Sequence, residues 1–294
     1  MRIVPKTASR RRFIRRGMEL GGGLLVVPAL SQTPDAGPTN DTLRTIHSLR
    51  TIHGNFSDKQ VPDREVKAIL GATIRAANAS NMQSYSIIVV RDAAMMQKLT
   101  GYRGSCLLLY CVDYNRTIDT AKHLGYEYHA ENMEAFITAS TNTILAAQTA
   151  VIAARSMGID SLLTNGIHRG DMERIWTLLE LPQTSCFPLI ALILGYPRTE
   201  SDHKSGRLSG PGVIHYEKFH RLTKEELDQI VLQCDDQAMQ LGGSAGWEKK
   251  GHKHYLDWFY KEWARGGRTT SETQMFKRLK KSGFVDLASA EPRT

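Results

Sequence analysis

Two hydrophobic patterns occur along this chain, one typical of helices and the other typical of strands. Apolar residues recur at three- and four-residue spacing after Pro62-Asp63, which predicts a helix over residues 62–77. Short continuous apolar runs predict strands, and these runs lie at 86–90, 107–112, 161–163 and 188–194. The run at 107–112 is apolar throughout, so we expect that strand to be buried on both faces.

A stretch without any charged residue, 138–154, predicts the most hydrophobic helix of the chain. Its lack of a polar face indicates burial all round, in the core or at a subunit interface. The stretch contains Gln, Asn and Thr, which argues against a stable membrane span. Capping residues and an aromatic stripe predict further helices at 171–181, 223–239, 252–263 and from 271 onward. Strands and helices mix without regular βαβ alternation, so we predict an α+β fold.

The positive charge of the chain is concentrated at its N-terminus. The net charge is +8, but residues 1–29 carry seven basic residues and one acidic residue, which leaves +2 for residues 30–294. A body this close to neutral does not indicate a general electrostatic grip on a phosphate backbone. We therefore predict no nucleic-acid partner.

Residues 1–29 resemble a twin-arginine export signal. The run Ser9-Arg10-Arg11-Arg12-Phe13 has the paired arginines and a large apolar residue, and the apolar stretch that follows is too short to span a bilayer. This resemblance implies the twin-arginine export machinery as a partner and a periplasmic location. The alternative is an uncleaved basic tail on a cytoplasmic protein. Residues 30–42 are interpreted as a linker.

Three other patterns carry no chemistry in our interpretation. Cys106 and Cys111 lie five residues apart on one expected strand, so their side chains point to opposite faces and do not suit one metal ion. Residues 242–246 match the G-x-S-x-G pattern of serine hydrolases, but no strand precedes them, so we expect a flexible turn. His252 and His254 have no acidic or cysteine partner at ligand spacing. We predict no metal site.

A doubled stretch, LRTIHS followed by LRTIHG, raises the question of which arginine has a function. A shift of six residues turns a helix by about 600°, so the two copies do not share a face. Only the second copy is followed by Gly-Asn-Phe, where we expect the helix to end and the chain to meet a ligand. We therefore expect Arg50 to be the functional residue and Arg44 to lie on the helix surface.

Two later segments also contain side chains suited to an anionic, planar ligand. Residues 76–85 carry several amides, which suit the donors and acceptors of a heterocycle or a ribityl chain. Residues 195–208 begin with Gly-Tyr-Pro and end with Lys204 and Arg207. With Arg50, these two cations would form a clamp for a dianionic phosphate.

Taken in order, these segments resemble the nitroreductase family of FMN-dependent oxidoreductases. The family pattern is Arg-x-Ser-x-Arg/Lys-x-Phe, then Pro-Ser-x-x-Asn-x-Gln-Pro-Trp entering a strand, then Gly-Leu-Gly-Thr-x-Trp-x-x-Gly, and finally Gly-Tyr-Pro with a basic pair. Residues 158–166 of this chain, GIDSLLTNG, match the third of these patterns. The resemblance covers about residues 43–210.

The resemblance implies FMN as the cofactor, with NADH or NADPH as a donor. Flavin N5 would carry the chemistry, so no catalytic residue is expected, and backbone N–H groups near Gly166 would contact it. Arg50 would hold the phosphate or the pyrimidine edge of the ring. The implied cofactor-binding residues are Arg50, Thr51, His53, Asn78, Asn81, Gln83, Thr164, Asn165, Gly166, Lys204 and Arg207.

The chain departs from the family pattern where a second substrate would lie. Ile52 and Gly54 stand where the family has its serine and its second base, Ser84-Tyr85 replace Pro-Trp, and Leu163 replaces a tryptophan. These departures change the pocket wall, whereas the implied FMN set is largely intact. The sequence therefore leaves the acceptor open.

The resemblance also implies the architecture and the assembly. We expect a central, mostly antiparallel sheet flanked by helices, in a homodimer with its FMN sites at the subunit interface and a swapped C-terminal region. The expected divisions are a signal at 1–29, a linker at 30–42, an FMN-binding domain at 43–220 and a helical extension at 221–294. The extension is expected to pack on the partner subunit.

The expected function is reduction of a nitroaromatic, quinone-like or related small acceptor. Two alternatives stay open: a flavoprotein that relays electrons to a partner protein, and a reductive dehalogenase-type member in which residues 115–137 form a lid. The export signal conflicts with a nicotinamide donor, which is not expected outside the cytoplasm. Either residues 1–29 are not an export signal, or the electron donor is a compound other than NADH or NADPH.

Overall fold

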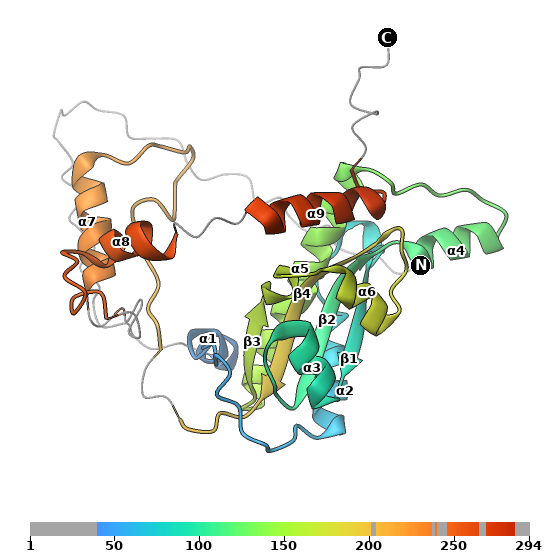
Figure 1. Cartoon of the computed structure of the whole chain (residues 1–294), viewed down its shortest axis with the longest axis horizontal. Helices are drawn as coiled ribbons and strands as arrows, with labels where there is room; N and C mark the ends of the chain where they lie inside the picture. Colours follow the sequence, from blue (N-terminus) through green and yellow to red (C-terminus); the bar gives the residue numbers. More distant parts are fainter. Residues whose placement is uncertain (1–39, 201–203, 237–238, 240–245, 265–268, 286–294) are drawn as a thin grey trace, which may run out of the picture.

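One antiparallel sheet forms the centre of the protein (Figure 1). The structure is a computed structural model and describes residues 40–200, 204–236, 239, 246–264 and 269–285. The strands follow the order β1-β2-β4-β3, and every pair of neighbours is antiparallel. Their bounds are Tyr85–Val90 for β1, Cys106–Asp113 for β2, Asp160–Thr164 for β3 and Cys186–Gly195 for β4. The four predicted strands and the α+β class are confirmed.

Helices cover both faces of this sheet, so its central strand β2 is inaccessible from either side. On one face α2 (Asp63–Thr73) and α5 (Met133–Ser156) pack on Cys106, Leu108 and Tyr110. On the other face α3 (Ala93–Thr100) and α6 (Glu173–Leu179) pack against the alternate residues of β2, among them Cys111. The two cysteines thus lie on opposite faces as free thiols, as the sequence predicts.

Helix α5 is only half buried within one chain, so it is not buried all round in the core, and burial of its outer side at a subunit interface stays a prediction. Its alanines at 139, 146, 147, 150 and 154 are buried against the sheet. Its outer side exposes Met133, Ile137, Ile144 and Leu145, with no charge between residues 138 and 154. Within the described ranges α5 is the one helix long and apolar enough to cross a membrane, a test that core helices of water-soluble proteins also meet. Its buried half makes it a core helix here.

The C-terminal region divides into two parts. Helix α7 (Lys224–Asp235), which the predicted capping box opens, and α8 (Tyr255–Trp258), with a π-helical turn over Phe259–Trp263, stand away from the sheet in Figure 1. Helix α9 (Thr269–Lys281) returns to the top of the body of its own chain. Helix α9 thus packs on its own chain, and packing of the extension on a partner subunit stays a prediction.

Helix α9 is anchored by a buried arginine and a buried phenylalanine. The Arg278 guanidinium lies 3.6 Å from the centroid of the Trp176 ring and 3.1 Å from Gln183 Oε1. Phe284 is fully buried, with its ring centroid 5.2 Å from that of Phe136. A short final helix was expected from the sequence, but not this attachment, because cation–π contacts depend on tertiary neighbours.

Several predicted boundaries shift. Helix α1 (Asp41–His47) includes two residues assigned to the linker and ends before the second copy of the doubled stretch, which is not helical. The predicted helix at 62–77 ends at Thr73. Residues 115–137 form α4 (Asn115–His123), a loop and the start of α5. The signal at 1–29 and residues 242–245 of the G-x-S-x-G pattern lie outside the described residues.

Candidate functional site

The segment after α1 lies along the free edge of β3. Thr51 forms a parallel bridge with Ser161, and the Ile52 N–H donates to the Ser161 carbonyl at 3.1 Å. Ile52 and Phe56 are buried in the core, whereas Thr51 and His53 are exposed. This copy of the repeat is extended because burial of the Ile52 and Phe56 side chains compensates for the hydrogen bonds that another helical turn would make.

Arg50 is held by two carboxylates. Its Nε lies 3.0 Å from Asp160 Oδ1 and its Nη2 lies 2.6 Å from Asp160 Oδ2 and 2.7 Å from Glu200 Oε2. The same buried aspartate accepts from Arg155 Nη1 at 2.8 Å, and Arg155 Nε donates to Ser48 Oγ at 3.0 Å. The hydrogen bond to Asp160 raises the pKa of Arg50 above its usual value, against the opposing effect of burial. Arg50 is thus already paired rather than free to clamp a phosphate alone.

Lys204 and Arg207 differ from Arg50 in having no carboxylate partner in the described part of the chain. The Lys204 ammonium donates to the carbonyl of His47, the last residue of α1. Arg207 Nη1 donates to the carbonyls of Ser205 and Gly206, at 3.1 and 2.9 Å. Both side chains are exposed. The contact with His47 brings Lys204 to the same end of β3 as Arg50, so two predicted phosphate ligands lie in one region.

The predicted ring-binding residues lie at the other end of β3. Thr164 ends the strand, and a 3-10 turn over Gly166–His168 follows. The Gly166 N–H donates to Thr164 Oγ1 at 2.9 Å, and a Cβ at Gly166 would lie 3.1 Å from that oxygen, so glycine permits this close turn. Four residue steps along β3 span roughly 13 Å. An elongated ligand could therefore lie along this edge, with its anionic end near Lys204 and its other end near the exposed Asn165.

The amide loop does not join this group within one chain. Asn78, Asn81 and Gln83 precede β1, which is the opposite edge of the sheet, three strand spacings or roughly 14 Å from β3. The loop is strained, because Ser80, Asn81 and Gln83 have positive φ angles of 52°, 55° and 49°. Such strain is typical of ligand-binding loops.

The amide loop is held by its own side chains and by α5. The Asn78 side-chain oxygen accepts from the Gln83 N–H at 3.2 Å, and Gln83 Nε2 lies 3.4 Å from Asn81 Oδ1. Asn142 Oδ1 on α5 accepts from the Ala79 N–H at 2.9 Å. The Asn142 amide nitrogen is buried without a hydrogen-bond partner, so one donor beside this loop is unused.

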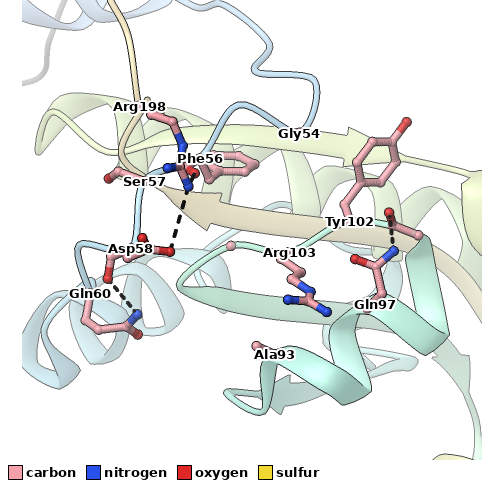
Figure 2. Close-up of a pocket in the computed structure, with 12 residues that line it drawn as sticks. Gly54, Phe56, Ser57, Asp58, Gln60, Ala93, Gln97, Tyr102, Arg103 and Arg198 are labelled. Atoms are coloured by element: carbon pink, nitrogen blue, oxygen red, sulfur yellow. Dashed lines mark hydrogen bonds and ion pairs between the residues drawn. The ribbon is translucent and has the colours of Figure 1, made fainter.

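A separate open cavity of about 530 Å³ lies on the α3 side of the segment after Gly54 (Figure 2). Arg198 reaches it from one wall, where it lies 3.8 Å from Asp58, and Arg103 reaches it from the loop after α3. Sequence reasoning did not point to this cavity. Its lining is Gly54, Phe56, Ser57, Asp58, Gln60, Ala93, Gln97, Gly101, Tyr102, Arg103, Gly104 and Arg198.

Sequence reasoning also missed the acids and the arginine that surround Arg50. Asp160 stands at the second glycine of the Gly-Leu-Gly-Thr pattern, and this exchange of glycine for a carboxylate was the available signal. Arg155 and Glu200 gave no local signal, because their positions in the sequence do not show what they contact.

Comparison with known proteins identifies the family to which this fold belongs. The sequence model of the Nitroreductase family matches residues 46–196, about half of the chain. The chain belongs to the nitroreductase family.

Curated relatives and solved structures agree with this assignment. An oxygen-insensitive NADPH nitroreductase of Salmonella typhimurium is 28% identical over 193 residues, which cover 62% of this chain and 75% of the relative. An FMN reductase (NADPH) of Bacillus subtilis is 29% identical over 62% of this chain and 75% of the relative. The structure of the NfrA1 nitroreductase of B. subtilis has a TM-score of 0.69 and 25% identity, covering 83% of this chain and 98% of the other. The predicted nitroreductase fold is confirmed.

Proposed function

We propose that this chain is an FMN-dependent oxidoreductase that uses a reduced nicotinamide nucleotide to reduce a small acceptor of the nitroaromatic or quinone class. Family membership supports the reaction class, and the relatives in Salmonella typhimurium and B. subtilis carry NADPH and FMN in their names. The observation that carries the proposal is the edge of β3. In the described part of the chain, the Lys204 ammonium lies near its start and has no carboxylate partner, and a glycine turn follows its end.

The residues present fit FMN at both ends of this edge. Lys204 and Arg207 are exposed cations whose described partners are backbone carbonyls, so a dianionic phosphate would meet them without displacing an acid. Bound FMN supplies the redox chemistry, and the protein supplies position and charge. Thr51 and His53, exposed beside β3, would line the path between the two ends. No described side chain is required as a general base.

A second copy of the chain would complete the site. The amide loop is on the far edge of the sheet, and the outer side of α5 is an uncharged apolar surface next to it, linked to it through Asn142. We propose that these surfaces pair in a homodimer, with the loop of one subunit reaching the flavin of the other. Exposed side chains on the α7–α8 part, such as Leu232 and Trp263, would add to the same interface.

The dimer is tested by a charge placed on the outer side of α5. Ile144→Glu should shift the protein to monomers in light scattering after gel filtration and lower its FMN content, because a buried unpaired carboxylate opposes association. Thr177→Glu, exposed on α6 at the other face of the sheet, is the matched control and should leave the mass unchanged. Equal masses for both variants would contradict the interface.

The reaction is tested with purified protein under anaerobic conditions. A yellow protein that NADPH bleaches, and that a nitroaromatic or quinone acceptor recolours, supports the proposal. A yellow protein that NADPH does not bleach supports an electron relay to a partner protein instead. A colourless protein that FMN cannot reconstitute contradicts both functions.

Export by the twin-arginine pathway belongs to the proposal as well. It rests on the arginine-rich pattern of residues 1–29, which lies before the segment that the family model matches. Fractionation of cells that express the full chain, beside an Arg10→Lys/Arg11→Lys variant, tests it. A periplasmic, shortened product that the variant abolishes supports export, and cytoplasmic retention of both forms contradicts it.

A further inference from the structure

Two carboxylates bind the same guanidinium but differ in burial. Asp160 is 2% exposed and contacts Arg50 through both of its oxygens, while Glu200 is 73% exposed and contacts Arg50 through one. Asp160 is also held by Arg155. A buried acid with two arginine partners is fixed in place, whereas an exposed ion pair is weak and exchanges readily with solvent.

Glu200 contacts Arg50, one of the cations of the predicted phosphate clamp. Glu200 precedes Lys204 by four residues in the sequence. The Lys204 ammonium donates to the carbonyl of His47, which itself precedes Arg50 by three residues. The Glu200 carboxylate thus places a negative charge on the outer side of Arg50, in the region of the predicted phosphate clamp. A carboxylate and a phosphate oxygen make the same charge-assisted hydrogen bond with a guanidinium, so only one of them can use this position on Nη2.

We propose that Glu200 is a specificity-determining residue that occupies Arg50 until a phosphate group displaces it, and that Asp160 is a positioning residue that holds Arg50 toward that phosphate. This inference rests on the proposed function, because the phosphate is that of FMN. Glu200 lowers the affinity of the site for a phosphate-bearing flavin, since the competent state is only partly populated. It has no effect on a flavin that lacks phosphate.

Asp160 has the opposite role. With an amide in place of this carboxylate, Arg50 would lose one of its two hydrogen bonds to residue 160 and would lie near Arg155 with no common counter-ion. The Arg50 guanidinium would then be free to rotate away, and the site would lose one phosphate donor. A glycine, which the family pattern has at this position, could not supply this anchor.

The test is titration of the apoprotein with FMN and with riboflavin, followed by quenching of flavin fluorescence. Glu200→Gln should tighten FMN binding about tenfold if Glu200 occupies Arg50 nine-tenths of the time, with riboflavin binding unchanged. Asp160→Asn should weaken FMN binding by about tenfold and leave riboflavin binding unchanged. Asp63→Asn is the matched control, because its exposed carboxylate pairs with Arg91 at 2.6 Å far from the site.

The coupling between residues decides whether Glu200 acts through Arg50. In an Arg50→Ala background, Glu200→Gln should no longer change FMN affinity. The inference is overturned if Glu200→Gln leaves FMN affinity at the level of the Asp63→Asn control, or tightens FMN and riboflavin equally. Because Asp160→Asn could unfold, the Glu200 result stands by itself. Failure of the unsubstituted protein to bind any flavin overturns the proposed function and this inference together, whereas FMN binding without a Glu200 effect overturns the inference alone.

Discussion

An inner group of cations, Arg50 and Arg155 at the start of β3, and an outer group, Lys204 and Arg207, have the same charge but different surroundings. Arg50 and Arg155 are mostly buried and share the carboxylate of Asp160. Lys204 and Arg207 are exposed and contact only backbone carbonyls in the described structure. The inner arginines hold the segment after α1, the end of α5 and the start of β3 together. The outer cations have no carboxylate partner in the described structure, so their charge is available to a ligand. Within the inner group, Arg50 also contacts the exposed Glu200, which is the side of its guanidinium that a phosphate could reach.

The largest expected effect comes from breaking the inner group. Asp160→Ala leaves two arginines mostly buried without their shared counter-ion, which should lower the free energy of unfolding by about 3–5 kcal/mol. Urea denaturation followed by circular dichroism measures the change. Glu200→Ala is the control, because loss of an exposed partner should cost less than about 1 kcal/mol. Similar losses for both variants would show that the inner group is not structural.

The next effect concerns the outer group. Arg207→Ala and Lys204→Ala should each weaken FMN binding by about tenfold, since each removes a charge-assisted hydrogen bond worth about 1.5 kcal/mol or more. Their free energy of unfolding without FMN should stay within about 0.5 kcal/mol of the unsubstituted protein. Equilibrium titration gives the affinity and urea denaturation the stability. A loss of stability with unchanged affinity would reverse the roles of the two groups.

The secondary structure was predictable because its signals are local. The apolar runs, the spacing before Thr73 and the capping box at Thr223 each act within a few residues, so every strand and most helices were found. The sequence left open whether the outer side of α5 is buried in the core or at a subunit interface, because uncharged composition does not distinguish the two. The helical reading of the second LRTIH copy was wrong, because Ile52 and Phe56 are drawn into a core formed by distant strands.

The site was predictable as a set of residues but not as a set of contacts. The family pattern pointed to Arg50, Lys204 and Gly166, and the structure places them along one strand edge. The partners of Arg50 are 110 and 150 residues away in the sequence, so no local pattern indicates them. The amide loop was expected beside the same flavin, but within one chain it lies at the opposite edge of the sheet.

A smaller effect separates geometry from charge in the inner group. Arg155→Lys keeps the positive charge near Asp160 but cannot bond Asp160 and Ser48 at once with a planar fork. The free energy of unfolding should fall by about 1 kcal/mol, as for one lost hydrogen bond, with little change in FMN affinity. Thermal and urea unfolding both measure this. A loss as large as that of Asp160→Ala would mean that the fork of Arg155, rather than the shared charge, holds the group together.

The smallest effect is expected for the first copy of the repeat. Arg44 is exposed on α1 and pairs with Asp41, itself almost fully exposed, so Arg44→Ala should change neither FMN affinity nor stability measurably. The comparison with Arg207→Ala is direct, because both variants remove one exposed arginine. Equal losses of FMN would defeat the assignment of Arg207.

The central claim is that an FMN phosphate is held by the outer cations of a nitroreductase-family protein. The most direct test is the ratio of FMN to riboflavin affinity of the unsubstituted apoprotein, at low salt and at about 1 M salt, where the screening length falls to about 3 Å. We predict that FMN binds at least about tenfold more tightly at low salt and that the ratio shrinks at high salt. Equal affinities for the two flavins at low salt would contradict the account.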